Sequence, residues 1–230
     1  MTCFELEPMY NVVRSVAHNI NYIQSALWES KQHEKLKYRI MISGHGRTGK
    51  DTAATILADM FGYRAGYSTS FAVLPLVCYS LHGCLDLPTQ EECYAERHKD
   101  RTYWYNYCNM LRVIDPHMLI KLTLAQTDFI VGTRDKSEFV NALDFFKPNN
   151  VLWMEREGVA VDPTMDYDRS FVAAECNKRL IRHTTVGNND SVDVLTQQLQ
   201  NLVKMNVIVP EDYIQKVINA TNVSSNTAKC

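Results

Sequence analysis

Nine consecutive residues near the start of the chain have the types and spacing of a phosphate-binding loop. The run Gly44-His45-Gly46-Arg47-Thr48-Gly49-Lys50-Asp51-Thr52 follows an apolar stretch, residues 38–43, and leads into a helix-like segment, residues 51–61. A strand, a glycine-rich turn and a helix let backbone N–H groups surround the β-phosphate of a nucleotide. Glycines allow close approach and positive φ angles, and a helix N-terminus favours an anion. The residues expected to bind the nucleotide are Gly44, Gly46, Arg47, Thr48, Gly49, Lys50, Asp51 and Thr52.

Lys50 and Asp51 have the clearest chemical roles in this loop. Lys50 would reach the β- and γ-phosphates as a mobile positive charge. The next residue is usually Ser or Thr, whose hydroxyl binds Mg²⁺, but here it is Asp51, followed by Thr52. A carboxylate can hold Mg²⁺ directly or through water, so Asp51 is the expected metal ligand. The alternative is a chance glycine turn, with Asp51 an ordinary residue at a helix N-terminus.

Length and composition indicate one sizeable core with additions. The chain has 230 residues, of which 46% are hydrophobic, and a formal net charge of −2. This charge argues against a protein that coats nucleic acid or a membrane surface. The seven cysteines include no Cys-x-x-Cys pair, which is typical of a reduced cytoplasmic protein. No apolar run is long enough to span a membrane.

Strand-like and helix-like segments alternate along most of the chain. Strands are expected at residues 38–43, 63–68, 128–134, 151–155 and 180–186. Helices are expected at residues 50–61, 70–81, 103–114, 116–126, 137–146, 169–177, 191–204 and 211–220, with a polar connection at 85–101. The alternation predicts an α/β fold, with a mainly parallel sheet flanked by helices. Ligands of such folds bind at the carboxyl ends of the strands.

An additional helix is expected before this core, because residues 9–28 have amphipathic spacing. It would pack on the core or on a second subunit, and the second arrangement would give a homodimer.

Five short motifs follow one another along the core. They are Gly49-Lys50-Asp51-Thr52, Ser70-Phe71-Ala72-Val73-Leu74-Pro75-Leu76, Thr133-Arg134-Asp135-Lys136-Ser137-Glu138, Arg156-Glu157-Gly158 and Val186-Gly187-Asn188-Asn189-Asp190-Ser191. In this order the chain resembles the P-loop nucleoside monophosphate kinases, in particular the deoxynucleoside monophosphate kinases of bacteriophages. The resemblance covers roughly residues 38–203. Only the loop motif is specific on its own, and the others gain weight from order and spacing.

The resemblance implies a P-loop kinase fold with recognisable parts. Residues 1–36 would be an N-terminal helical extension and residues 37–204 the kinase core. Within that core, about residues 82–126 would form a substrate-binding insertion and about residues 156–170 a lid. Residues 205–230 would form a C-terminal helix and tail. A protein of this kind would work in the cytoplasm, which is the host cytoplasm if a phage encodes it.

The resemblance also implies ATP-dependent phosphorylation of a deoxynucleoside 5′-monophosphate, with ATP and Mg²⁺ as cofactors. Phosphoryl transfer needs alignment, metal and positive charge around the moving group. Lys50, Arg134 at a strand end and Arg156 at the lid hinge are therefore the expected catalytic residues. For either arginine, the alternative is a surface ion pair.

The acceptor is expected to bind near a dense charged run, residues 96–101. In the family this region carries substrate-binding groups, so Arg97, Lys99 and Arg101 are expected to hold the acceptor phosphate. Trp104, in the aromatic stretch that follows, could stack on the base. A solvated charged face and packing of Trp104 in the core are the alternatives.

Gly132 departs from the family pattern, because an acidic residue that supports Mg²⁺ often stands there. The metal would then depend on Asp51 and water, or on Asp135. Two other functions stay open. One is phosphorylation of the hydroxyl of a hydroxymethylpyrimidine nucleotide, free or within DNA. A basic groove with exposed aromatic residues would favour the acceptor within DNA. The other is nucleotide binding without catalysis.

Overall fold

The computed structural model describes residues 22–25, 36, 38–64, 68–82, 87–97, 99–163, 165–205 and 207–208. Most of the helix expected at residues 9–28, and all of the helix expected at 211–220, lie outside these residues. Residues 22–25 are helical, and the Tyr22 hydroxyl donates a hydrogen bond to the Ala72 carbonyl at 3.0 Å. This described part of the extension therefore contacts the core.

Four parallel strands form the centre of the fold, in the order β2-β1-β3-β4. They are β1 (Ile40–Ser43), β2 (Phe129–Val131), β3 (Asn150–Glu155) and β4 (Arg182–Gly187). The expected mainly parallel sheet is thus confirmed. Of the strand expected at residues 63–68, the described part contributes a single bridge between Ser68 and Val131 beside β2. Because all pairs are parallel, the four carboxyl ends lie at one edge of the sheet.

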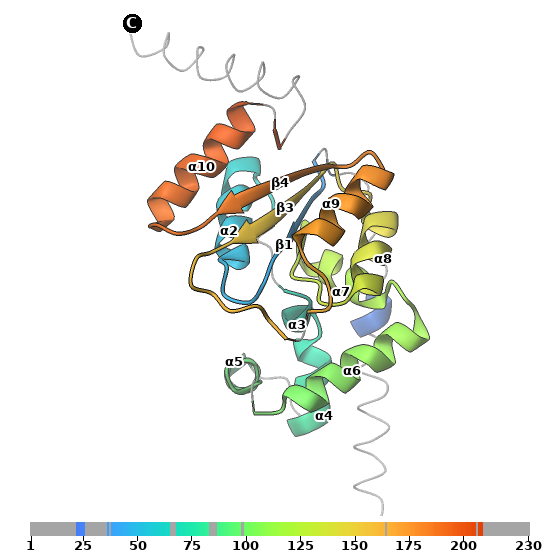
Figure 1. The fold of residues 1–230 in the computed structure, drawn as a ribbon. Helices are drawn as coiled ribbons and strands as arrows, with labels where there is room; N and C mark the ends of the chain where they lie inside the picture. Colours follow the sequence, from blue (N-terminus) through green and yellow to red (C-terminus); the bar gives the residue numbers. More distant parts are fainter. Residues whose placement is uncertain are drawn as a thin grey trace, which may run out of the picture.

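Helices cover both faces of this sheet, as Figure 1 shows. One face packs against α2 (Lys50–Phe61) and α10 (Val192–Lys204), through residues such as Leu57 and Leu199. The other face packs against α7 (Met118–Gln126), α8 (Lys136–Phe146) and α9 (Arg169–Lys178), through residues such as Phe139 and Val172. The strands are buried on both sides, which explains their nearly continuous apolar sequences.

A separate group of helices lies below the sheet in Figure 1. It comprises α3 (Thr69–Ala72), α4 (Leu74–His82), α5 (Leu87–Glu96) and α6 (Arg101–Ile114). Together with α7 these helices have their own apolar core, which includes Val77, Trp104 and Leu111. Of this group, α5 and α6 lie within residues 82–126, where the resemblance implies an insertion.

Two expectations about these helices were wrong. The single helix expected at residues 70–81 is divided at Val73 into α3 and α4. Pro75 explains the division, because it has no N–H with which to continue a helical hydrogen-bond ladder. The connection expected at residues 85–101 contains α5. This helix buries Cys93, and Tyr94 packs against the same cluster.

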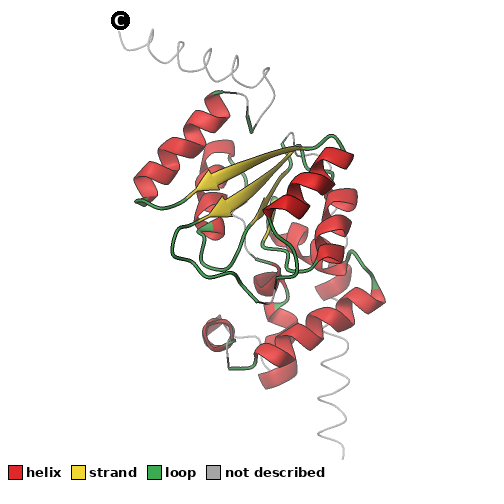
Figure 2. Cartoon of the chain, viewed as in Figure 1, coloured by secondary structure: helices red, strands yellow, loops and turns green. Residues whose placement is uncertain are grey.

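The loops that follow β3 and β4 leave the sheet at the same edge, as Figure 2 shows. The glycine-rich loop, residues 44–49, follows β1 there and leads directly into α2. Residues 132–135 connect β2 to α8, and residues 156–168 connect β3 to α9. The fold therefore brings four connecting segments together where parallel sheets bind ligands. Among the described helices, none has the length and apolar character to cross a bilayer.

Candidate active site

The glycine-rich loop depends on glycine at both of its ends. Gly44 has a φ angle of 136°, and a Cβ there would collide with the Met154 carbonyl oxygen of β3. Gly49 has a φ angle of 88°, and a Cβ there would collide with the Asn188 side-chain amide. That amide donates a hydrogen bond to the Thr48 carbonyl at 3.0 Å. The loop is thus held between β3 and the segment before α10, in a conformation that other residues rarely adopt.

Lys50 begins α2 and extends its ammonium group back over the loop. Its Nζ atom donates a hydrogen bond to the His45 carbonyl oxygen at 2.5 Å. Its Cε atom lies 3.4 Å from the position that a Cβ of Gly132 would occupy. The pKa of Lys50 is lowered to about 8, chiefly by burial and in part by the charge of Arg134, while the charges of Asp51 and Asp162 oppose the change. An anion placed among these groups would favour the protonated lysine.

Arg134 lies at the same edge, just after β2. Its NH1 atom pairs with Asp162 Oδ2 at 2.9 Å. The same carboxylate oxygen lies 3.2 Å from the position of a Cβ on Gly46. A carboxylate from the segment after β3 therefore lies between Arg134 and the glycine-rich loop. The sequence contained no signal for this placement, because residues 159–165 belong to none of the recognised motifs.

A hydroxyl network fixes the strand ends beside Arg134. The Tyr167 hydroxyl donates to the Thr133 carbonyl oxygen at 2.8 Å and lies 2.8 Å from Ser43 Oγ and 2.6 Å from Thr133 Oγ1. Burial raises the pKa of this phenol far above its ordinary value, so it remains a hydroxyl. Tyr167 thus connects the ends of β1 and β2 to the segment before α9.

Arg97 follows α5 and is held on the ring of Tyr94. Its guanidinium carbon lies 3.9 Å from the centroid of the Tyr94 ring, and its NH1 atom donates to the Tyr94 carbonyl oxygen at 2.6 Å. Desolvation raises the pKa of Asp51, although its side chain reaches solvent, and the charges of Lys50 and Arg97 oppose the rise. Arg97 therefore lies close enough to affect the first turn of α2.

The other residues expected at the acceptor site are less well placed. Lys99 pairs with Glu96 at 2.5 Å, and both side chains are 58% exposed, so the solvated charged face describes Lys99 better. Arg101 begins α6, and its side chain lies outside the described parts of the chain. Trp104 is buried in the helical core and contacts the Tyr94 ring edge-on. This environment favours the packing alternative for Trp104.

A cavity of about 420 Å³ opens beside the glycine-rich loop. Its walls include Lys50, Asp51 and Thr52, together with Arg156 from the segment after β3 and Asn188 before α10. Arg47, with a positive φ angle of 62°, also lines it. Arg156 borders a second cavity of about 480 Å³ as well, next to His45, Thr48 and Arg169. The structure therefore brings Arg156 to the glycine-rich loop.

The site suits a phosphate chain better than a metal cage. Close-approach glycines, a helix N-terminus and a lysine form a cradle for an anion. Within the described residues, no group of three or more His, Cys, Asp or Glu side chains could hold a metal ion. Mg²⁺ commonly uses one or two carboxylates together with substrate phosphates and water, and the accessible Asp51 fits that requirement. Asp135 does not, because its carboxylate caps α8 and pairs with Arg112.

Sequence reasoning missed three residues that the structure brings to the site: Asp162, Tyr94 and Asn188. Only Asn188 had a signal, since it lies in a recognised motif, but no role was assigned to it. No family model, curated protein or solved structure matches the chain. The chemical interpretation of the site therefore depends on its geometry and on the resemblance found in the sequence.

Proposed function

We propose that this protein is an ATP-dependent phosphotransferase with a P-loop kinase fold. It transfers the γ-phosphoryl group of ATP to a deoxynucleoside 5′-monophosphate and forms ADP and a deoxynucleoside diphosphate. The observation that carries the proposal is the meeting of Lys50 and Arg134 at the glycine-rich loop. Lys50 follows the loop after β1, and Arg134 lies just after the neighbouring strand β2. The Lys50 side chain packs beside Gly132, and the charge of Arg134 lowers the pKa of Lys50.

The donor would bind with its phosphates on the loop. Backbone N–H groups of residues 44–49 and the N-terminus of α2 supply fixed partial positive charge, and Lys50 adds a full charge. The adjoining 420 Å³ cavity, between Arg156 and Asn188, has room for the rest of the nucleotide. Arg156 is exposed and can approach the phosphates from the segment after β3.

The acceptor would bind between the loop and the insertion. Arg97 supports this placement, because it is held on the Tyr94 ring and its charge acts on Asp51, in the first turn of α2. Ser68 lies beside Gly132, and its hydroxyl is 3.3 Å from the Tyr94 hydroxyl. A monophosphate bound by Arg97 would present its oxygen towards Lys50 and Arg134. Such an acceptor is already an anion, so the reaction needs no general base.

Arg134 would stabilise the charge that spreads over the moving phosphoryl group. The incoming phosphate must first replace the Asp162 carboxylate as its partner. Mg²⁺, when bound, would neutralise charge on the β- and γ-phosphates. Asp51 is the residue of this chain that would hold it, directly or through water.

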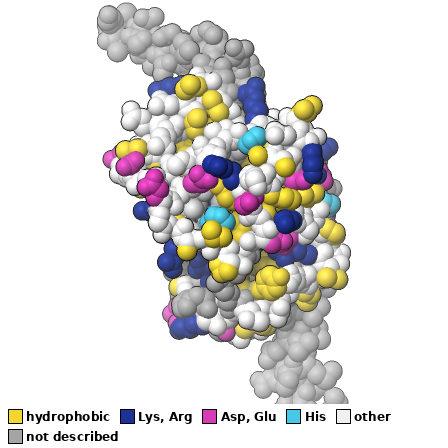
Figure 3. Space-filling model, viewed as in Figure 1, with side chains coloured by type: hydrophobic (Ala, Val, Ile, Leu, Met, Phe, Trp, Pro, Cys, Tyr) yellow, Lys and Arg dark blue, Asp and Glu magenta, His cyan; other side chains and the backbone are white. Residues whose placement is uncertain are grey.

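The surface favours a free nucleotide over a DNA acceptor. On the face shown in Figure 3, acidic and basic side chains are interspersed, and no continuous basic track is visible. The net charge of −2 points the same way. Proteins that follow a DNA backbone usually carry a basic stripe.

An acceptor panel tests the proposal. The protein is incubated with MgATP and, separately, each deoxynucleoside monophosphate, a hydroxymethylpyrimidine nucleotide and an oligonucleotide that contains the modified base. ADP and the phosphorylated acceptor are quantified, with Lys50→Ala as the negative control. Stoichiometric diphosphate and ADP from at least one mononucleotide support the proposal. Phosphorylation of the oligonucleotide alone, or nucleotide binding without any product, contradicts it.

A further inference from the structure

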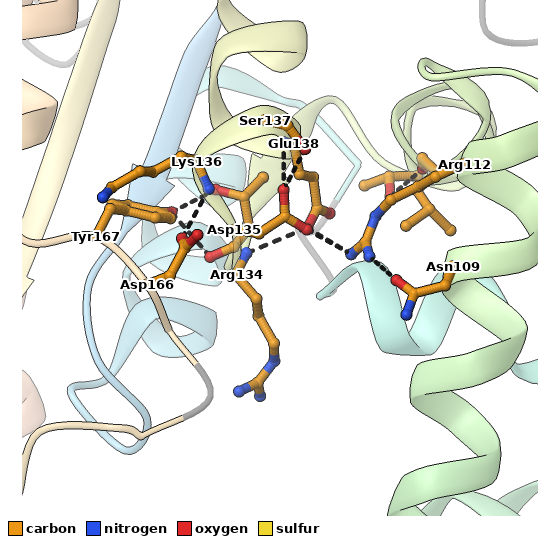
Figure 4. A network of polar contacts seen from close by, with 12 residues as sticks. Asn109, Arg112, Arg134, Asp135, Lys136, Ser137, Glu138, Asp166 and Tyr167 are labelled. Carbon is orange, nitrogen blue, oxygen red and sulfur yellow. Dashed lines mark hydrogen bonds and ion pairs between the residues drawn. The ribbon is translucent and has the colours of Figure 1, made fainter.

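A buried polar network connects Arg134 to helix α6, as Figure 4 shows. Its central residue is Glu138, in the first turn of α8, whose side chain is only 2% exposed. One carboxylate oxygen, Oε2, accepts hydrogen bonds from the Arg134 backbone N–H at 3.2 Å and from Arg112 NH2 at 3.0 Å. The other oxygen, Oε1, has no hydrogen-bond partner among the described residues.

The start of α8 differs from an ordinary capping box. Asp135 is the N-cap, and its side chain accepts the Glu138 N–H at 2.7 Å. In a capping box the glutamate bonds back to the N–H of the N-cap residue itself. Here Glu138 bonds to the N–H one position earlier, at Arg134. The Arg134 carbonyl oxygen also accepts the Asp166 N–H at 3.2 Å, so its backbone is held on both sides.

Arg112 supplies the counter-charge from α6. Its NH2 atom lies 3.0 Å from Glu138 and 3.2 Å from Asp135, and its NH1 atom donates to Asn109 at 2.6 Å. Burial raises the pKa of Glu138, and Arg112 is the strongest opposing influence. Without Arg112 the ionised form of the buried Glu138 carboxylate would lose its main stabilising charge. A protonated Glu138 would accept the Arg134 N–H more weakly.

We infer that Arg112 is a positioning residue, through which the insertion sets the orientation of Arg134 by way of Glu138. The inference rests on the proposed phosphotransferase function, in which Arg134 acts on the moving phosphoryl group. The helix that carries Arg112 begins at Arg101, a few residues after Arg97. The same helix group therefore carries the acceptor-binding Arg97 and fixes the backbone of Arg134. This one helix group would therefore align both the acceptor phosphate and the charge of Arg134.

The chain contains a matched control for this connection. Arg179 also bridges two carboxylates, Asp144 at 2.7 Å and Glu175 at 2.6 Å. The Arg112 and Arg179 side chains are similarly exposed, 19% and 24%. Arg179 follows α9 and precedes β4, so it lies towards the amino ends of the strands, away from the site. Arg179→Met therefore removes a comparable bridge that has no connection to Arg134.

The experiment compares Arg112→Met, Arg179→Met and the wild type. It measures kcat, KM, ATP affinity by calorimetry, and thermal unfolding. We expect Arg112→Met to lower kcat roughly ten- to a hundredfold, the range that follows from small misplacements of catalytic groups. Its ATP affinity should stay within about twofold of the wild type, because the loop is unchanged. Arg179→Met should leave kcat unchanged at a similar loss of thermal stability.

Glu138→Gln is the second variant, in case Arg112→Met does not fold. It keeps the shape of the side chain but removes its charge, and we expect the same selective loss of kcat. Equal kcat losses in Arg112→Met and Arg179→Met, or an unchanged kcat in Glu138→Gln, would overturn the inference and leave the proposed function standing.

Amide hydrogen exchange separates failure of the inference from failure of the proposed function. If the wild type phosphorylates no acceptor, the proposed function fails, and exchange at Arg134 decides the inference. Faster exchange of that N–H in Arg112→Met or Glu138→Gln, but not in Arg179→Met, supports the connection. Identical exchange in all of them overturns it.

Discussion

Replacing Asp162 with asparagine should strengthen polyphosphate binding. The Asp162 carboxylate pairs with Arg134 at 2.9 Å and lies against Gly46 in the loop. A phosphate bound there would compete with it for Arg134 and would be repelled by its charge. Asparagine keeps the size and polarity of the side chain but removes the negative charge.

The structure sets the size of this effect. The Asp162 side chain is 12% exposed, but Arg134 is 43% exposed, so solvent screens the pair. Exposed ion pairs contribute about 0.2–1 kcal/mol. Loss of this competition should therefore increase affinity by at most about fivefold, since about 1.4 kcal/mol corresponds to a factor of ten. A larger gain would mean that the Asp162 carboxylate repels the bound phosphates more strongly than a solvent-screened ion pair allows.

Calorimetric titration with pyrophosphate and with MgATP at pH 7 measures the change. At this pH Lys50, with a pKa of about 8, is still mostly protonated. Glu157→Gln is the control, because it removes an exposed negative charge from the same connecting segment. The reasoning is refuted if Asp162→Asn binds pyrophosphate no more tightly than Glu157→Gln. Weaker binding of MgATP alone would instead make Asp162 a metal ligand.

Three further predictions concern the loop. Lys50→Ala should stay folded by circular dichroism but lose about 10²–10³-fold in kcat, because one charge that stabilises the transition state is removed; near-normal turnover would contradict the assignment. Since bound phosphate keeps Lys50 protonated, ATP affinity should fall as the pH rises above about 8, by at most about tenfold per pH unit, and Lys50→Arg should abolish this fall in calorimetry. Asp51→Asn should raise the Mg²⁺ concentration for half-maximal rate, and an unchanged requirement would exclude Asp51 as a ligand.

Glycine substitutions separate backbone strain from contact within the same structure. Gly49 and Gly62 both have positive φ angles, 88° and 66°, but a Cβ at Gly62 would meet nothing within 4 Å. Gly62→Ala should cost about 1–2 kcal/mol in urea unfolding, the left-handed conformation alone, and should leave ATP binding intact. Gly49→Ala should cost more and weaken ATP binding, because its Cβ collides with Asn188. Equal effects on ATP binding would contradict this account of the loop.

Local sequence determined much of the architecture. The helices α8 and α10 begin where capping residues occur: Asp135 and Ser191 each accept a backbone N–H of the following turn. The glycine-rich loop could be located because a strand, glycines and a helix are neighbours in the chain. Strand, turn and helix patterns act over a few residues, so one sequence was enough to predict this loop and the parallel sheet around it.

Helix α5 shows where local pattern failed. Its sequence, Leu87–Glu96, contains a proline and several charges, which is typical of a connecting segment. Its helical state is supported by tertiary contacts of Cys93 and Tyr94 with the helical core. Helical stability in proteins comes mostly from such packing. The sequence pattern of a ten-residue segment does not indicate these tertiary contacts.

The candidate site also combines residues that were expected from the sequence with contacts that only the structure shows. From the sequence, Lys50 and Arg134 were expected at the site by their types and by the strands before them, and Arg97 was expected there through the family resemblance. Only the tertiary structure decided that Asp162 faces Arg134 and that Arg112 reaches Glu138, 26 residues further along the chain. Side-chain contacts of this kind depend on how segments that are distant in the sequence pack against one another. The sequence fixes which groups are available, and the packed fold decides which of them meet.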